Sequence, residues 1–174
     1  GGRDVLSEVG GIMCLQAINT LMADDEVKIL VVLGKPPAPE VEKKILEAAG
    51  TGGKPTVLGF IGGETRKDFQ NIYACRGLEE TAVVAAALAN GEDVGEARNA
   101  LFSEYAVLKA LAVNVGRRKG FLRGLFSGGT LCYEAQVVAG EILGPIFSNT
   151  PLKKEMKLAD SLKSKKHTIV DYGE

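Results

Sequence analysis

Three pairs of adjacent glycines stand where the chain is expected to turn between a strand and a helix. Gly10-Gly11 precede a predicted helix, Gly62-Gly63 end a predicted strand, and Gly128-Gly129 lie between a short apolar run and a predicted helix. Without a Cβ atom the main chain can approach a ligand closely, and the N–H groups at a helix start attract phosphate or carboxylate. The plain alternative for each pair is a tight turn. Together the pairs predict a site for a small anionic molecule, although none matches GxGxxG or GxxxxGK[ST].

The third pair is surrounded by side chains that can do chemistry. Ser127 and Thr130 flank it with hydroxyl groups, and Thr130 is expected to cap the following helix. Cys132 is a candidate thiolate of lowered pKa near the helix start, or else a small core residue. Glu134 lies four residues after Thr130 on the same helical face, as a carboxylate beside the loop or as a solvated helix residue.

Two further candidates for catalysis are Lys35 and His167. Lys35 follows an apolar strand-like run, where its cation could stabilise negative charge that develops on a carbonyl or phosphoryl oxygen. His167 is the one histidine in the sequence, so any histidine-dependent mechanism must use it; the alternative is a structural role. One histidine and three scattered cysteines do not form a metal-ligand pattern, and we expect no metal site.

The order of predicted elements indicates an α/β fold. Apolar spacing predicts a helix at about residues 12–22, and the β-branched run 27–34 predicts a strand buried on both faces. Further predicted elements are helices at 39–50, 78–90 and 94–115 and strands at 54–63 and 71–75. This alternation, with short connections, is typical of a parallel sheet flanked by helices.

A new unit is expected to begin at about residue 120. There the order of strand, paired glycine and helix repeats, and residues 149–166 follow with six lysines against Glu155 and Asp160. Such a segment is typical of an exposed connection; the alternative is a loop that faces an anion. Because the chain opens on a glycine-rich loop and stops at a strand-like run, we expect it to be part of a longer protein.

Composition narrows the class of partner. The 174 residues carry a formal net charge of -1, and the sequence pI is about 6.0. Without a basic excess we expect no nucleic-acid binding, so the partner is a small molecule or another protein. Three cysteines without pairing pattern predict reduced thiols in the cytoplasm. No apolar run approaches the roughly 18 residues that would span a bilayer, so we expect no membrane contact.

Several motifs together resemble one family. "GGRDVLSEVGG", "DDEVKILVVLGKPP", "GGKPTVLGFIGG", "LRGLFSGGTLCYEA" and "KSKKHTIVDYG" are similar to the FdrA family, within the superfamily of succinyl-CoA synthetase and the ADP-forming acyl-CoA synthetases. The resemblance covers nearly the whole chain. It implies a flavodoxin-like ligase domain over residues 1–92, a helical connection over 93–119, and the beginning of a second ligase-like α/β domain over 120–174.

The resemblance also implies a site and its ligands. In the synthetases the loop corresponding to "GGRD" and the helix start after the next glycines face the active site, which carries Gly1, Gly2, Asp4, Gly10 and Gly11 over to this chain. Implied cofactors are coenzyme A and a nucleotide or phosphate-bearing substrate. Implied partners are a small anionic substrate and either other protein subunits or further copies of the chain.

This chain departs from the superfamily at two segments. Lys35-Pro36-Pro37 stand where the relatives have Glu-Ile-Gly-Gly, and the segment after Gly63 lacks the Gly-His-Ala-Gly motif whose histidine is phosphorylated. Phosphohistidine transfer therefore cannot run on this segment. The resemblance then implies an enzyme or subunit that transfers an acyl, carbamoyl or phosphoryl group, including an oxamate carbamoyltransferase subunit in ureide (allantoin) catabolism. The alternative is a non-catalytic binding or regulatory scaffold with the synthetase fold.

Overall fold

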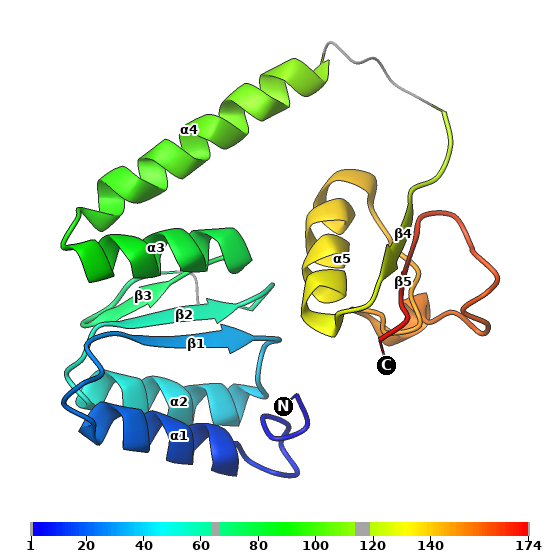
Figure 1. The fold of residues 1–174 in the computed structure, drawn as a ribbon. Helices are drawn as coiled ribbons and strands as arrows, with labels where there is room; N and C mark the ends of the chain where they lie inside the picture. The colour runs from blue at the N-terminus through cyan, green and yellow to red at the C-terminus, as the bar shows by residue number, and fades with distance from the viewer. Residues whose placement is uncertain (1, 64–66, 114–118, 174) are drawn as a thin grey trace. The chain divides into compact units, whose positions relative to one another are not determined.

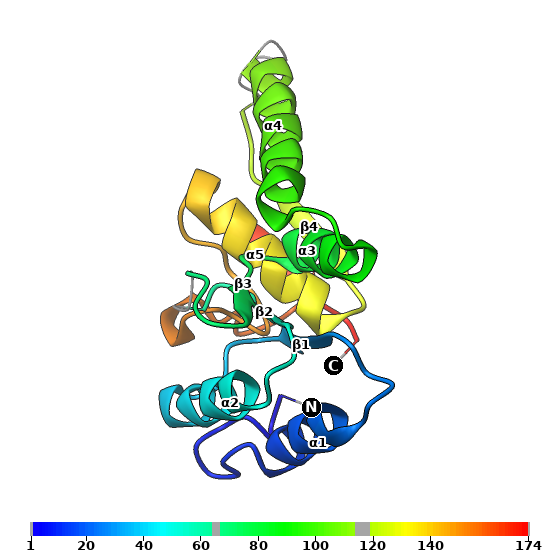
Figure 2. The same cartoon turned by 90° about the vertical axis from the view of Figure 1, so that its left-hand side faces the viewer.

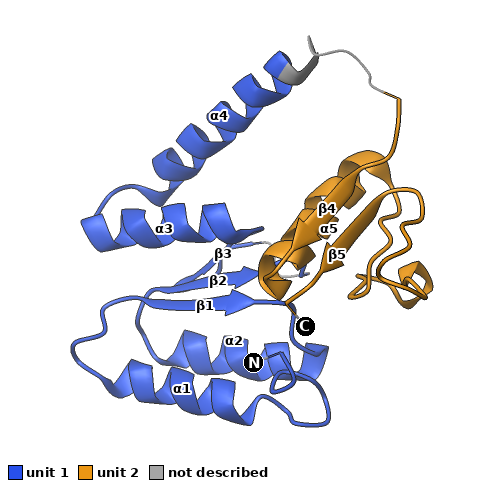
Figure 3. Cartoon of the chain, turned by 45° about the vertical axis from the view of Figure 1, so that its right-hand side comes forward, with its two compact units in different colours: residues 1–114 blue, residues 115–174 orange. Residues whose placement is uncertain are grey.

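A computed structural model describes residues 2–63, 67–113 and 119–173. The chain divides into two compact units, residues 1–114 and 115–174 (Figure 3). Both units combine parallel strands with covering helices (Figure 1). This confirms the predicted α/β class and is consistent with a flavodoxin-like fold. Each unit is described by itself below.

The first unit contains a three-stranded parallel sheet. Its strands are β1 (Leu30–Gly34), β2 (Thr56–Phe60) and β3 (Ile72–Ala74), in the order β1-β2-β3. In the register, Thr56 of β2 lies opposite Leu30 on one side and Ile72 on the other. The covering helices are α1 (Ile12–Ala23), α2 (Pro39–Thr51) and α3 (Leu78–Asn90).

Helices cover both faces of this sheet (Figures 1 and 2). On one face Ile18 of α1 and Ile45 of α2 pack with Leu58 in a buried cluster. On the other face Val84 of α3 packs with Val57 of β2. Burial of these aliphatic side chains is the main stabilising contribution, at roughly 1.5–3 kcal/mol for each fully buried residue.

The prediction for the first strand was wrong in its start and in its burial. β1 begins at Leu30 rather than at residue 27, and its burial alternates. Val31 and Leu33, on the face that α3 covers, are 44% and 47% exposed. The reason is the place of β1 at the edge of the sheet, since α3 packs chiefly over β2. The middle strand β2 is buried at every residue, as expected for a strand covered on both faces.

Helix α4 (Val94–Val113) follows α3. It covers most of the segment expected as a helical connection, and it belongs to the first compact unit. Leu101 is its buried anchor, whereas Val107, Leu108 and Leu111 are exposed. Residues 114–118 of the expected connection lie outside the described residues.

The second unit is a small α/β layer. Strand β4 (Arg123–Phe126) pairs in parallel with β5 (Thr168–Asp171). Helix α5 (Gly129–Leu143) packs against both strands. On the α5 face Cys132, Ile146 and Ile169 form a buried cluster, and on the opposite face Val170 packs with Phe147 and Leu158. Because α5 begins three residues after β4 ends, its start lies at the carboxyl edge of the strands.

The lysine-rich segment 149–166 matches the predicted exposed connection. All six of its lysines are exposed, and it contains a short 3-10 turn, η1 (Lys154–Met156), followed by a single bridge between Lys157 and Ser148. Leu158 anchors it in the core of the second unit.

Candidate functional site

At the start of α1, two main-chain amides donate hydrogen bonds to the carboxylate of Asp4. Asp4 Oδ1 accepts the Met13 amide at 3.0 Å, and Asp4 Oδ2 accepts the Cys14 amide at 2.8 Å. These are amides of the first helical turn, which would otherwise be available to an external anion. The Asp4 carboxylate therefore occupies the place at the start of α1 where we expected an anionic ligand to bind. Gly2 is exposed, and Gly1 lies outside the described residues.

The fold itself requires the glycines at positions 10 and 11. Both have positive φ, +76° and +78°, a conformation that costs side-chain-bearing residues free energy. A Cβ atom on Gly11 would lie 2.6 Å from Val41 Cγ1 of α2. The tight-turn interpretation explains this pair, because the turn and the close packing on α2 both need glycine.

The glycines after β2 form a hydrogen-bonded turn. The Gly63 amide donates to the Phe60 carbonyl oxygen at 2.8 Å, and Gly62 has a φ of +72°. The expected strand thus ends at Phe60, before the glycines. Lys35, directly after β1, is half-buried and makes contacts in the structure. Lys35 and the glycine turn lie at the carboxyl edge of the first sheet.

The start of α5 differs from that of α1. Gly128 is the N-cap residue, no described side chain caps the helix, and its first turn carries no acidic residue. The first main-chain bond runs from the Cys132 amide to the Gly128 carbonyl oxygen at 2.9 Å. No acceptor among the described residues takes the amides of Gly129, Thr130 and Leu131. The partial positive charge at this helix end is therefore available to an anion.

Gly128 has no conformational or packing requirement for glycine. Its φ of -149° and ψ of 112° are ordinary extended values, and no described atom lies within 4 Å of where a Cβ would stand. In this respect it differs from Gly11 and Gly62. The open space beside Gly128 fits the interpretation that this glycine allows close approach of another group.

Asp171 lies at the same edge, at the end of β5. Its side chain is on the face of Ile169, which packs with Cys132 of α5. Only 1% of Asp171 is exposed. Oδ1 accepts the Gly173 amide at 2.9 Å, whereas the buried Oδ2 has no hydrogen-bond partner among the described residues. An unsatisfied buried carboxylate oxygen is costly, so it calls for a partner such as a bound group.

The main chain at Asp171 is fixed on both sides. Asn149 Nδ2 donates to the Asp171 carbonyl oxygen at 2.7 Å, and Asn149 Oδ1 accepts the Asp171 amide at 2.9 Å. The next residue, Tyr172, donates its amide to the Phe126 carbonyl oxygen at 2.7 Å. A Cβ on Gly173 would lie 2.6 Å from the Ser127 carbonyl oxygen. The end of β5 is thus held against the loop that starts α5.

The other candidates around this loop fall into different environments. Cys132 is 0% exposed and packs in the core of the second unit, in agreement with the alternative of a small core residue, and a lowered pKa of its thiol stays a prediction. The predicted cap by Thr130 was wrong, because α5 begins at Gly129 and Gly128 takes the N-cap position. Ser127 and Thr130 are exposed beside the open amides, and Glu134 is half-buried on the next turn. Burial raises the pKa of the Tyr133 hydroxyl.

His167 has a structural role in the second unit. Its Nδ1 accepts the Leu122 amide at 3.1 Å, and its ring meets Phe121 edge-on at 5.3 Å between centroids. An Nδ1 that accepts a main-chain hydrogen bond places the ring proton on Nε2. His167 therefore fixes the entry to β4, in agreement with the structural alternative.

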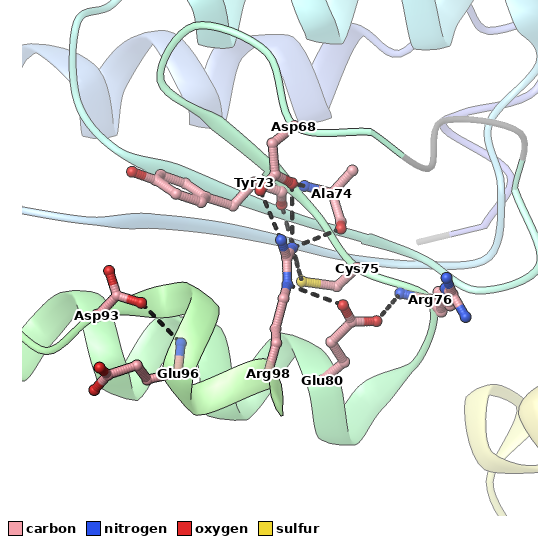
Figure 4. A network of polar contacts seen from close by, with 9 residues as sticks. All are labelled: Asp68, Tyr73, Ala74, Cys75, Arg76, Glu80, Asp93, Glu96 and Arg98. Carbon is pink, nitrogen blue, oxygen red and sulfur yellow. Dashed lines mark hydrogen bonds and ion pairs between the residues drawn. The ribbon is translucent and has the colours of Figure 1, made fainter. Parts of the chain in front are cut away.

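A polar network that the sequence did not indicate joins α4 to the first sheet (Figure 4). Arg98 binds Asp68 through two nitrogens, at 2.6 Å and 3.2 Å, and its Nε lies 3.0 Å from Glu80 Oε1. It also donates to the Ala74 carbonyl oxygen at 2.8 Å. Burial lowers the Arg98 pKa, but the bonds to Asp68 and Cys75 outweigh it and raise the pKa overall. Burial likewise raises the pKa of the Cys75 thiol. This network lies within the first unit and holds α4 against β3. Arg98 Nε contacts Glu80 as an ion pair and has no hydrogen-bond partner among the described residues.

Two properties of the described residues bear on the kinds of partner that the chain could bind. Every helix in those residues is too short or too polar to cross a lipid bilayer. Those residues also hold no group of three or more histidine, cysteine, aspartate or glutamate side chains that could bind a metal ion.

Comparison with known proteins identifies a relative but does not indicate an activity. No protein-family model matches the chain. Over 175 aligned positions it is 35% identical to the uncharacterized protein YahF of Escherichia coli (strain K12), an alignment that covers 100% of this chain and 34% of YahF. The chain thus spans about a third of the length of this curated relative.

Proposed function

We propose that this chain is part of an enzyme that transfers an acyl, carbamoyl or phosphoryl group, similar to the FdrA family and the acyl-CoA synthetases. The observation that carries the proposal is the uncapped start of α5 beside the buried Asp171 carboxylate at one edge of the second unit. The motif "SGGTLCYEA", which carries the family resemblance, forms this helix start.

The chemistry that this arrangement can supply is stabilisation of an oxyanion. When a nucleophile adds to a carbonyl or phosphoryl centre, electron density moves onto the oxygen, and it returns when the leaving group departs. Main-chain amides fixed at a helix start stabilise that charge without reorganisation. The amides of Gly129, Thr130 and Leu131 are the donors of this kind that we assign. They suit an oxygen of a carboxylate, of coenzyme A or of a nucleotide phosphate equally well.

A non-catalytic scaffold is the second candidate, and one observation favours it. The sequence has a single histidine, and its Nδ1 is engaged by the Leu122 amide. A phosphohistidine intermediate would have to use this ring through Nε2 or a residue from another chain. An oxamate carbamoyltransferase subunit needs no phosphohistidine and stays within the enzyme proposal.

The test uses the full-length protein with its partner subunits. We expect turnover in an assay of carbamoyl transfer or of acyl-CoA formation, and a large loss of that turnover in Gly128→Val. Valine suits the extended backbone at this position and fills the space beside the amides. The matched control is Gly140→Ala in the interior of α5, where the backbone is helical and no described atom lies within 4 Å of a Cβ. No turnover in either assay would remove the enzyme proposal and leave the scaffold.

A further inference from the structure

Asp171 is bonded at every polar position except one. Its amide and carbonyl groups are held by Asn149, and its Oδ1 accepts the Gly173 amide. Oδ2 is buried and has no donor in the part of the chain that the structure describes. A carboxylate oxygen removed from water in this way needs a hydrogen-bond donor, because the loss of hydration is otherwise uncompensated. The bond from the Gly173 amide to Oδ1 fixes the orientation of the carboxylate, and Oδ2 keeps its place.

The position of this oxygen relates it to the open start of α5. Asp171 pairs with Phe126, the last residue of β4, so the loop to α5 begins beside it. Its side chain shares the α5 face of the sheet with Ile169. Gly173 packs against the Ser127 carbonyl oxygen, which keeps the turn after β5 next to that loop. The acceptor and the amide donors therefore occupy one edge of one small layer.

A carboxylate at the same edge as an anion site repels an anion that has no donor hydrogen to offer it. The repulsion between two like charges is stronger near a protein surface than in water. The repulsion is relieved when the ligand places a hydrogen between its own charge and the carboxylate. The first-turn amides of α5 and Asp171 Oδ2 are therefore together complementary to a ligand that carries an oxyanion and a neighbouring donor hydrogen.

We propose that Asp171 is a specificity-determining residue that selects oxyanions bearing a hydrogen-bond donor group, such as the N–H of a primary amide. The ligand's charged oxygen binds the first-turn amides of α5, and its donor group binds Asp171 Oδ2. This inference rests on the proposed function, since it needs the start of α5 to bind an oxyanion. It adds Asp171 as the group that discriminates between ligands at this site.

A pair of isosteric probes tests the selection. Phosphonoacetamide and acetonylphosphonate share the phosphonate and the carbonyl group and differ only in an amide NH₂ against a methyl group. Each is titrated into the 174-residue chain while the amide resonances of Gly129, Thr130 and Leu131 are followed. We expect phosphonoacetamide to bind about tenfold more tightly, the effect of one hydrogen bond to a charged acceptor.

The variant Asp171→Asn should abolish this preference. Asparagine has the same shape, and its carbonyl oxygen can still accept the Gly173 amide, which leaves an NH₂ group at the position of Oδ2. We expect the ratio of the two dissociation constants to fall to about one, with acetonylphosphonate binding no more weakly than before. The control is Asp160→Asn, which removes the same charge from a carboxylate paired with Lys163 in the same unit. It should keep the tenfold ratio.

The outcomes separate this inference from the proposed function. If neither probe shifts the three amides of the wild-type chain, the proposed oxyanion site and the role of Asp171 both fail. If both probes bind the wild-type chain equally, the oxyanion site stands and the role of Asp171 is overturned. The wild-type ratio is decisive by itself if Asp171→Asn does not fold. A ratio that stays at tenfold in a folded Asp171→Asn chain also overturns the inference.

Discussion

The side chain of Asn149 holds both main-chain polar groups of Asp171, donating to the carbonyl oxygen at 2.7 Å and accepting the amide at 2.9 Å. The side-chain amide of Asn149 thereby bonds to the main chain at the end of β5 as the main chain of a neighbouring strand would. It keeps the Asp171 carboxylate at the edge where α5 begins. This clamp joins residues 22 positions apart, so no local pattern in the sequence indicates that they contact each other.

Loss of this clamp should loosen the end of β5. We expect Asn149→Ala to lower the free energy of unfolding of the second unit by about 2 kcal/mol, because two hydrogen bonds are lost. Hydrogen exchange of the Asp171 amide should become faster by more than tenfold. Asn90→Ala is the control, since Asn90 makes an exposed bond to Glu92 in the first unit. Unchanged protection of the Asp171 amide would show that Asn149 does not hold it.

Asp4 should control the acidity of Cys14 as well as the start of α1. Burial and then the Asp4 carboxylate raise the pKa of the Cys14 thiol, so the thiolate that reacts with iodoacetamide forms at higher pH than in an unfolded chain. Asp4→Asn removes the second cause, and we expect the pH profile of Cys14 alkylation to move to lower pH. Cys75 in the same sample is the control, because its pKa is raised chiefly by burial. A Cys14 profile that does not move would contradict the assigned cause.

The two kinds of glycine should respond differently to alanine. Gly11→Ala places a side chain at a φ of +78° and 2.6 Å from Val41 Cγ1, and we expect a loss of about 2–4 kcal/mol of stability. Gly128→Ala meets neither obstacle, and we expect a change within about 1 kcal/mol. Urea unfolding of both variants measures the difference. Equal losses would mean that the fold requires Gly128 too, and the functional interpretation of this glycine would lose its basis.

The network around Arg98 should matter for stability. Arg98→Ala leaves the buried Glu80 without its cation, and breaking such a pair costs about 3–5 kcal/mol. We expect a clear fall in the midpoint of urea unfolding of the first unit. Arg76→Ala is the matched control, because the Arg76 side chain is exposed and lies over the Phe102 ring. A similar small effect for both variants would mean that α4 is held by apolar contacts alone.

The fold could be predicted further from the sequence than the site. Apolar spacing and breaker residues located the helices and the α/β class, because these patterns act within one element. The exposure of β1 could not be predicted, since it depends on which strand takes the sheet edge. The Arg98 network and the Asn149 clamp join residues far apart in sequence, so no local pattern marks them. A reactive residue type does not by itself indicate a functional site. Cys132 packs in the core, and His167 accepts a main-chain amide.

The oxyanion site at the start of α5 is tested most directly by titrating the ¹⁵N-labelled chain with inorganic phosphate, an oxyanion that carries its own O–H donor at neutral pH. We expect saturable shifts of the amide resonances of Gly129, Thr130 and Leu131, and their loss in Gly128→Val. We expect no comparable shift of Met13 and Cys14, whose amides are bonded to Asp4. Shifts confined to the start of α1, or no shift at the start of α5, would contradict an oxyanion site at the start of α5.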